Sequence, residues 1–245
     1  MEEHLSGTEF EAELAKAMVK IVPAHLKTCM ENKVLDYDSY GTDNEKTLKL
    51  ILKYFANIRS VLRDIDLSLN FLGKKRDVIL SDYSFLESQG EYYKYHYENY
   101  YIRLLTLLDL IGKLGTLLYD LDLDLNKVSA YIFKDKAKKE GHGNVSNIVD
   151  RLVEKFVELK TERHKKLHSG KADIEPFNEV VIWEDINSII GSDTDEILKH
   201  YTDEKINEEI QLLKTNTTEI IDIVKEFLEE AKSKLREKIT TANNV

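Results

Sequence analysis

The stretch LLTLLDLIGKLGTLL, residues 104–118, is the most apolar part of this 245-residue sequence. Leucine and isoleucine occur there at nearly every angle around a helix axis, a pattern typical of a helix that is buried on all sides. We therefore expect a helix over residues 91–121 at the centre of a helical bundle. Gly112 and Gly115 would allow another helix to approach it closely.

The composition supports the same fold class for the whole chain. Only 10 Gly and 2 Pro interrupt 245 residues, and 33% of the residues are charged against 42% hydrophobic. Chains with so few helix-breaking residues are usually helical. We predict an all-α protein, a bundle with long up-and-down helices, folded as a single domain over residues 1–245.

Two capping boxes mark helix starts in the N-terminal third of the chain. The first begins at Thr8 and opens a helix that Pro23 helps to end. The second begins at Thr42, after a loop over residues 31–43, and opens a helix that Gly73 stops near residue 72.

Further helices are expected by the same reasoning from apolar spacing and breakers. Residues 176–190 are ambiguous between strand and helix, and a helix suits their surroundings better. The last helix has apolar positions spaced four and three apart, the pattern of a long packed helix. The expected ranges are 74–88, 125–140, 144–167, 176–190 and 203–240.

Charge and cysteine content limit the class of protein. The net charge of −10 argues against a protein that coats nucleic acid, although it leaves room for an enzyme with a local basic cleft. A single cysteine, Cys29, cannot form an internal disulfide. We find neither a signal peptide nor a membrane span, so we expect a cytoplasmic protein with no membrane partner.

The segment TERHKKLHSG, residues 161–170, carries the candidate functional residues. Arg163 continues an apolar stripe of the helix 144–167, and an arginine at such a position calls for a partner or a task. His168 follows five residues later, about 140° further around an ideal helix, where Ser169-Gly170 should end the helix. A tightened last turn, or a second subunit, would bring the imidazole to the same cleft.

Arginine and histidine are the residues that metal-independent RNA cleavage requires. A histidine titrating near neutral pH exchanges protons with the ribose 2′-hydroxyl or the leaving 5′-oxygen. An arginine holds the scissile phosphate and stabilises the charge that develops on it. The surrounding lysines make the segment locally basic: Lys155, Lys160, Lys165, Lys166 and Lys171.

The segment RHKKLH, residues 163–168, resembles the signature of the HEPN superfamily, Arg-polar-x3-His late in a helix. The segment YENYYIRLL, residues 97–105, resembles the central helix of that family, and Glu98 is the best candidate for its acidic residue facing the motif. The resemblance covers a core of about residues 90–170. It leaves the flanking helices within 1–89 and 171–245 unexplained.

The resemblance implies a homodimer that brings two Arg/His pairs into one composite cleft. It also implies an endoribonuclease of the toxin–antitoxin, phage-defence or RNA-processing kind that leaves a 2′,3′-cyclic phosphate. Arg163 would clamp the phosphate and His168 would act as general acid and base, supported by His164 and Glu98. Lys160, Lys165, Lys166 and Lys171 would contact RNA. No cofactor or metal is implied, and a protein antitoxin is a possible partner.

Other interpretations of the same residues stay open. The alternative function is a non-catalytic dimeric binding module of the same fold, and a third possibility is a structural helical protein in which the motif is accidental. In the last case Arg163 would pair internally with Glu98 or another buried acid. His164 and His168 have the spacing of two metal ligands, but no third ligand follows. The tyrosines of residues 92–101 fit core and interface packing better than base stacking.

Overall fold

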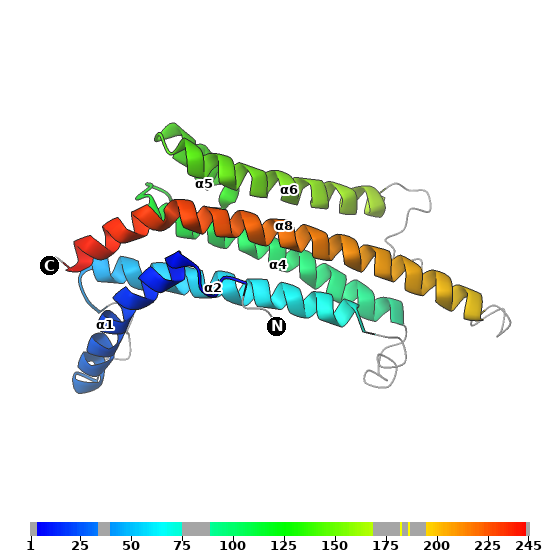
Figure 1. Ribbon diagram of the computed structural model, residues 1–245, viewed down its shortest axis with the longest axis horizontal. Helices are drawn as coiled ribbons and strands as arrows, with labels where there is room; N and C mark the ends of the chain where they lie inside the picture. The colour runs from blue at the N-terminus through cyan, green and yellow to red at the C-terminus, as the bar shows by residue number, and fades with distance from the viewer. Residues whose placement is uncertain are drawn as a thin grey trace. The chain divides into compact units, whose positions relative to one another are not determined.

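A computed structural model of the chain describes residues 4–33, 40–74, 89–168 and 195–243, together with 182 and 186. Its description of side chains leaves out 89–91, 160–168, 195–199, 201–202 and 243 within the helices. The elements in chain order are α1 (Glu9–Glu31), α2 (Asp43–Leu72), α4 (Gln89–Leu118), α5 (Ala130–Lys139), α6 (Gly143–His168) and α8 (Asp195–Asn243) (Figure 1). Every regular element in the described ranges is a helix, which confirms the predicted all-α class.

The chain divides into two compact units. Unit 1 consists of Met1–Leu62, Thr106–Val153 and Ile221–Val245, and unit 2 consists of Arg63–Leu105 and Glu154–Ile220. Helices α2, α4, α6 and α8 each contribute one portion to each unit. None of the helices in the described ranges is apolar over a length sufficient to cross a lipid bilayer.

The core of unit 1 contains the apolar part of α4 from Thr106 onwards. Ile111 and Leu114 are fully buried there. A Cβ atom at Gly112 would lie 2.4 Å from the carbonyl carbon of Ser129, and one at Gly115 would lie 2.5 Å from the Phe133 ring. The two glycines therefore permit close contact, as predicted, and the element that approaches is the start of α5.

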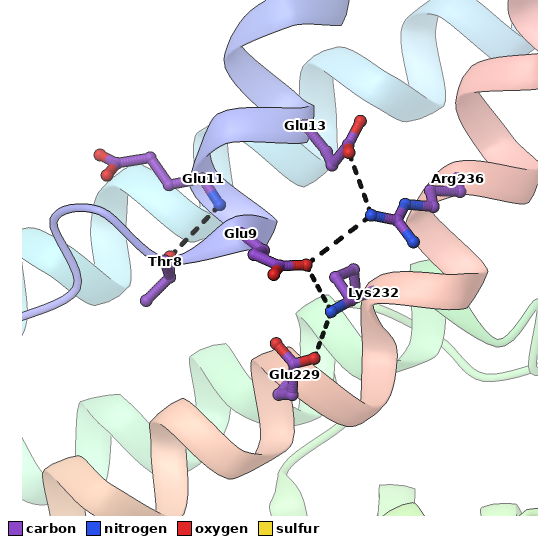
Figure 2. Close-up of polar contacts among 7 residues, drawn as sticks. All are labelled: Thr8, Glu9, Glu11, Glu13, Glu229, Lys232 and Arg236. Carbon is purple, nitrogen blue, oxygen red and sulfur yellow. Dashed lines mark hydrogen bonds and ion pairs between the residues drawn. The ribbon is translucent and has the colours of Figure 1, made fainter.

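Both predicted N-caps are present, and the capping box is complete at Thr42, whereas near Thr8 the Glu11 carboxylate accepts the N–H of Gly7 at 2.9 Å. The hydroxyl of Thr8 accepts a hydrogen bond from the backbone N–H of Glu11 at 3.3 Å (Figure 2). The hydroxyl of Thr42 accepts one from the N–H of Glu45 at 3.3 Å, and the Glu45 carboxylate accepts the N–H of Thr42 at 2.7 Å. These side chains satisfy amides that the first turns leave unpaired.

Three predicted helix boundaries are wrong. Helix α4 ends at Leu118 rather than at residue 121, because the backbone of Asp120 adopts a left-handed conformation with φ 52°. Helix α1 does not end near Pro23 but continues to Glu31, because Ile21, His25 and Cys29 bury one face on both sides of the proline. Helix α5 begins at Ala130 rather than at residue 125. The carboxylate of Asp124 accepts the N–H of Asn126 at 2.9 Å, a local turn that competes with helix formation.

The remaining boundaries agree with the sequence or extend it. Helix α2 ends at Leu72, and α6 covers the expected 144–167 with one more residue at each end. Helix α8 is longer than the expected 203–240. The predicted apolar positions of α8 are all buried: Ile206, Ile210, Leu213, Thr217, Ile220, Val224, Phe227 and Ala231. The helices predicted over 74–88 and 176–190 lie outside the described residues.

Candidate functional site

The predicted motif lies at the C-terminal end of α6, whose last residue is His168. The stripe that leads to it is buried, with Phe156 and Leu159 only 4% and 2% exposed. Helix α6 continues without a break from Leu159 through residues 163–168, which form its last turns. The prediction of a helix that extends to about residue 167 is therefore confirmed, and the roles of the motif residues stay predictions.

The side chains of the motif lie outside the described residues. This applies to Arg163, His164 and His168, and to the predicted RNA-binding residues Lys160, Lys165, Lys166 and Lys171. Their mutual geometry stays a prediction. Within the ranges that the structure does describe, no three His, Cys, Asp or Glu side chains cluster as metal ligands would.

Glu98, the predicted acidic residue of the site, is described and half-buried on α4. It belongs to unit 2, which also contains the part of α6 from Glu154 onwards. The structure therefore places Glu98 and the motif-bearing turns in the same compact unit. Glu98 is also flanked along the chain by the buried side chains of Tyr97 and Tyr100.

A buried polar layer joins this part of α4 to α8. The hydroxyl of Tyr97 donates to Oε1 of Glu209 at 3.1 Å, and the Tyr101 hydroxyl lies 3.3 Å from that of Tyr97. One turn further, the Tyr100 hydroxyl donates to the backbone carbonyl of Leu213 at 3.3 Å and contacts the Thr217 hydroxyl at 3.0 Å. The layer fixes the register of the two helices, because the hydroxyls of Tyr97 and Tyr100 each have a specific partner on α8.

Burial keeps the phenols of Tyr97 and Tyr100 neutral. It raises the pKa of Tyr97 far above its usual value, and the neighbouring Tyr101 and the Glu209 carboxylate raise it further. Burial also raises the pKa of Tyr100. Both side chains are therefore hydrogen-bond donors at physiological pH and do not act as bases.

The tyrosine cluster serves mainly as core, as the sequence indicated. Tyr92, Tyr93, Tyr97, Tyr100 and Tyr101 are all buried. Tyr95 is different, since 64% of it is exposed. It begins a row along α4 in unit 2 that continues through the half-buried Glu98 to the exposed Ile102 and Leu105, at spacings of three, four and three residues. We call these four residues the α4 row.

The histidine of this region, His96, is unsuited to proton transfer near neutral pH. Its ring stacks on Phe71 with centroids 4.6 Å apart and meets the edge of Tyr92 at 4.5 Å. Burial lowers the pKa of His96 to about 4, and the Lys74 ammonium lowers it in the same direction. His96 is therefore a neutral packing residue, and the motif histidines remain the candidates for catalysis.

Two details of the region were not foreseen from the sequence. Lys155 was counted among the locally basic residues, but its ammonium pairs with the Glu219 carboxylate at 2.5 Å, so its charge is offset within unit 2. Glu209, a buried carboxylate, was missed. The sequence does indicate that Glu209 is buried, because it lies three residues after Ile206 and four before Leu213, both on the buried stripe of α8.

Comparison with known protein families identifies the family of the chain. The model of the Cthe2314-like HEPN family matches residues 81–236. No curated protein and no solved structure shows a significant match to the chain. The match includes α4, α5, α6 and most of α8, so the long C-terminal helix belongs to the family region although the predicted core ended near residue 170. Since the match covers more than half of the sequence, the chain belongs to the HEPN superfamily.

Proposed function

We propose that this protein is a metal-independent endoribonuclease in which Arg163 and His168 form the catalytic pair. Membership of the family indicates a nuclease or nucleotide-related role in general. The observation that carries the finer proposal is the position of RHKKLH at the end of α6, within the unit that also holds Glu98. Arginine and histidine together supply what phosphodiester cleavage by an internal hydroxyl requires.

The proposed reaction is a transesterification that consumes neither water nor an oxidant. The ribose 2′-oxygen attacks the adjacent phosphorus while His168 accepts the 2′-hydroxyl proton. The bond from phosphorus to the 5′-oxygen breaks, and that oxygen takes a proton from an imidazolium. Arg163 neutralises the charge that builds up on the phosphate oxygens. The products are a 2′,3′-cyclic phosphate and a 5′-hydroxyl.

A homodimer would supply the acid and the base as two separate imidazoles. On a single helix Arg163 and His168 are about 140° apart, so a pair made by one α6 alone is poorly aligned. The α4 row offers an exposed surface in the same unit, with Tyr95, Ile102 and Leu105 each about half exposed or more. Exposed apolar rows of this spacing are typical of helix–helix interfaces.

The ends of the RNA fragments test the proposed chemistry. Mass spectrometry of fragments from a defined single-stranded RNA, cleaved in the presence of EDTA, is expected to show 2′,3′-cyclic phosphate and 5′-hydroxyl ends. Fragments with 3′-hydroxyl and 5′-phosphate ends, or cleavage that depends on a divalent ion, would overturn the proposal. Binding of RNA without any cleavage would instead indicate the non-catalytic module.

A further inference from the structure

Helix α1 has an apolar face on the side that points away from its own core. The buried side of α1 carries Phe10, Leu14, Ala17, Met18, Ile21, His25 and Cys29. The opposite side carries apolar residues at spacings of three and four: Ala12, Ala15, Val19, Val22, Leu26 and Met30. We call these six residues the outer stripe. It spans about five helical turns, roughly 27 Å.

The outer stripe is exposed to an unusual degree for apolar side chains. Val19 is 72% exposed and Met30 is 80% exposed, and Leu26 is also exposed. Single exposed apolar residues are ordinary, but a continuous row along a helix marks a surface that another helix covers. Helix α1 lies outside the region that matches the family, so the stripe is not explained by the family core.

Lysines line one edge of the outer stripe. On an ideal helix Lys16, Lys20 and Lys27 lie about 60–100° from Val19, all on the same side. All three side chains are exposed. Lys27 makes a long contact of 3.9 Å with Glu31, and at this exposure such a pair contributes little. The outer stripe therefore has one basic edge.

The acidic residues at the start of α1 do not offset these lysines, because cations of unit 1 already pair with them. Figure 2 shows Lys232 and Arg236 of α8 directed at α1: Lys232 contacts Glu9 at 2.6 Å, and Arg236 contacts Glu13 at 3.1 Å. Lys232 lowers the pKa of Glu9, which keeps the carboxylate charged and paired. These contacts also fasten the N-terminal part of α1 to α8, so the outer stripe is presented on an anchored helix.

We propose that the outer stripe of α1 is a docking surface for an amphipathic helix of a partner protein, with Asp and Glu beside the apolar row of that helix. The apolar row of the partner would cover the outer stripe, and its carboxylates would face Lys16, Lys20 and Lys27. A helix of about 20 residues matches the length of the stripe. The charges select the partner and orient it, while the apolar contacts supply most of the affinity.

The same charges argue against a second copy of α1 as the occupant. In an antiparallel helix pair equivalent edges face each other, so the three lysines would meet the three lysines of the other copy. A parallel pair would place them opposite an edge without an exposed carboxylate. A lipid surface is also a poor match, because the stripe has no aromatic residue to anchor it and the chain carries a net charge of −10.

The test uses the full chain and two labelled helical peptides of about 21 residues, three heptads each. Both peptides carry Leu at the seam positions, and one carries Glu and the other Lys at the flanking positions. Fluorescence anisotropy is expected to show binding of the Glu peptide and at least about tenfold weaker binding of the Lys peptide. The triple variant Lys16→Glu, Lys20→Glu, Lys27→Glu is expected to reverse this preference.

Matched variants distinguish binding at the outer stripe from nonspecific binding of the peptide elsewhere on the protein. The double variant Leu26→Gln, Met30→Gln is expected to weaken binding of the Glu peptide about tenfold or more. As controls, Leu212→Gln and the triple variant Lys138→Glu, Lys139→Glu, Lys214→Glu change exposed residues outside α1 and are expected to bind as the wild type does. The proposal is overturned if the Glu peptide does not bind the wild type, or if variants of the outer stripe bind this peptide as the wild type does. It is also overturned if these variants lose self-association or binding to anionic vesicles and keep binding of the Glu peptide.

Discussion

The hydroxyl of Tyr97 on α4 donates a hydrogen bond to the carboxylate of Glu209 on α8 across 3.1 Å, with both side chains buried. The two residues are separated by 112 positions in the sequence. Their contact holds together, within unit 2, the helix that carries Glu98 and the long helix that completes the family region. A buried carboxylate with a dedicated donor is more sensitive to loss of that donor than to loss of both partners.

Removal of the Tyr97 hydroxyl is expected to destabilise the protein measurably. Tyr97→Phe takes a donor from the buried Glu209 carboxylate and should reduce the free energy of unfolding by about 1–3 kcal/mol. The measurement is urea denaturation of four proteins: wild type, Tyr97→Phe, Glu209→Gln and the double variant. A double-mutant cycle with no coupling energy would contradict the contact. Tyr131→Phe, at a partly exposed phenol, serves as the control.

Substitution of Gly112 by alanine should lower the free energy of unfolding, whereas the same substitution within a helix usually raises it. Alanine normally favours a helix over glycine by about 1 kcal/mol. At Gly112 the new methyl group would lie 2.4 Å from the backbone of Ser129, so we expect Gly112→Ala to be destabilising by about 1–3 kcal/mol.

Gly143 provides the comparison for Gly112. It also lies in a helix, but a Cβ atom there meets nothing within 4 Å. Gly143→Ala should therefore be neutral or stabilising when both glycine variants are compared with the wild type by thermal denaturation. Equal effects of the two substitutions would show that the approach of α5 to α4 is looser than described.

His96 should make stability depend on pH below neutrality. Its pKa is about 4 in the folded protein against 6.5 for the free side chain, so the unfolded state binds the proton first as the pH falls. The contribution of the neutral His96 to the free energy of unfolding is fully present above pH 6.5. This contribution is lost progressively as the pH falls from about 6.5 to about 4.

Two measurements check the titration of His96. The His96 ring signals should titrate near pH 4 by NMR, and the unfolding free energy of His96→Gln should depend less on pH over this interval than that of the wild type. His200→Gln changes an exposed histidine and is expected to keep the wild-type slope. Titration of His96 near 6.5 would contradict its burial between Phe71 and Tyr92.

Much of the fold follows from local sequence signals. Thr42 and Gly73 define α2 because a cap and a helix terminator act over a few residues. Pro23 misled the prediction because its effect on a helix is local, whereas burial of Ile21 and Cys29 depends on packing that the sequence does not display. Residue 125 was misplaced for a similar reason, since Asp124 stabilises a turn through its own side chain.

The candidate site was predictable in its position and less so in its surroundings. The apolar stripe and the Ser169-Gly170 break placed the motif at a helix end, and α6 ends at His168. The pairing of Lys155 with Glu219 joins residues 64 positions apart and has no sequence signal. The spacing of Glu209 on the α8 stripe indicates burial, but its contact with Tyr97 joins residues 112 positions apart and has no sequence signal.

Disruption of the α4 row is expected to reduce self-association and cleavage together. Ile102→Gln with Leu105→Gln removes two exposed apolar side chains from the proposed dimer surface and leaves the buried core of α4 unchanged. Sedimentation equilibrium should show at least about tenfold weaker association, with RNA cleavage falling in parallel at low protein concentration. Leu212→Gln on α8 is the matched control. Undiminished association would exclude the α4 row as the dimer surface.

The most direct test of the account is cleavage of a defined single-stranded RNA in EDTA by four proteins: wild type, Arg163→Ala, His168→Ala and His200→Ala. We expect the wild type and His200→Ala to cleave alike, because His200 is exposed on α8, lies outside the motif and contacts Glu204 at 3.4 Å. Each motif variant should be at least about a hundredfold slower while remaining folded. Cleavage by His168→Ala at the wild-type rate would contradict the assignment of the catalytic pair.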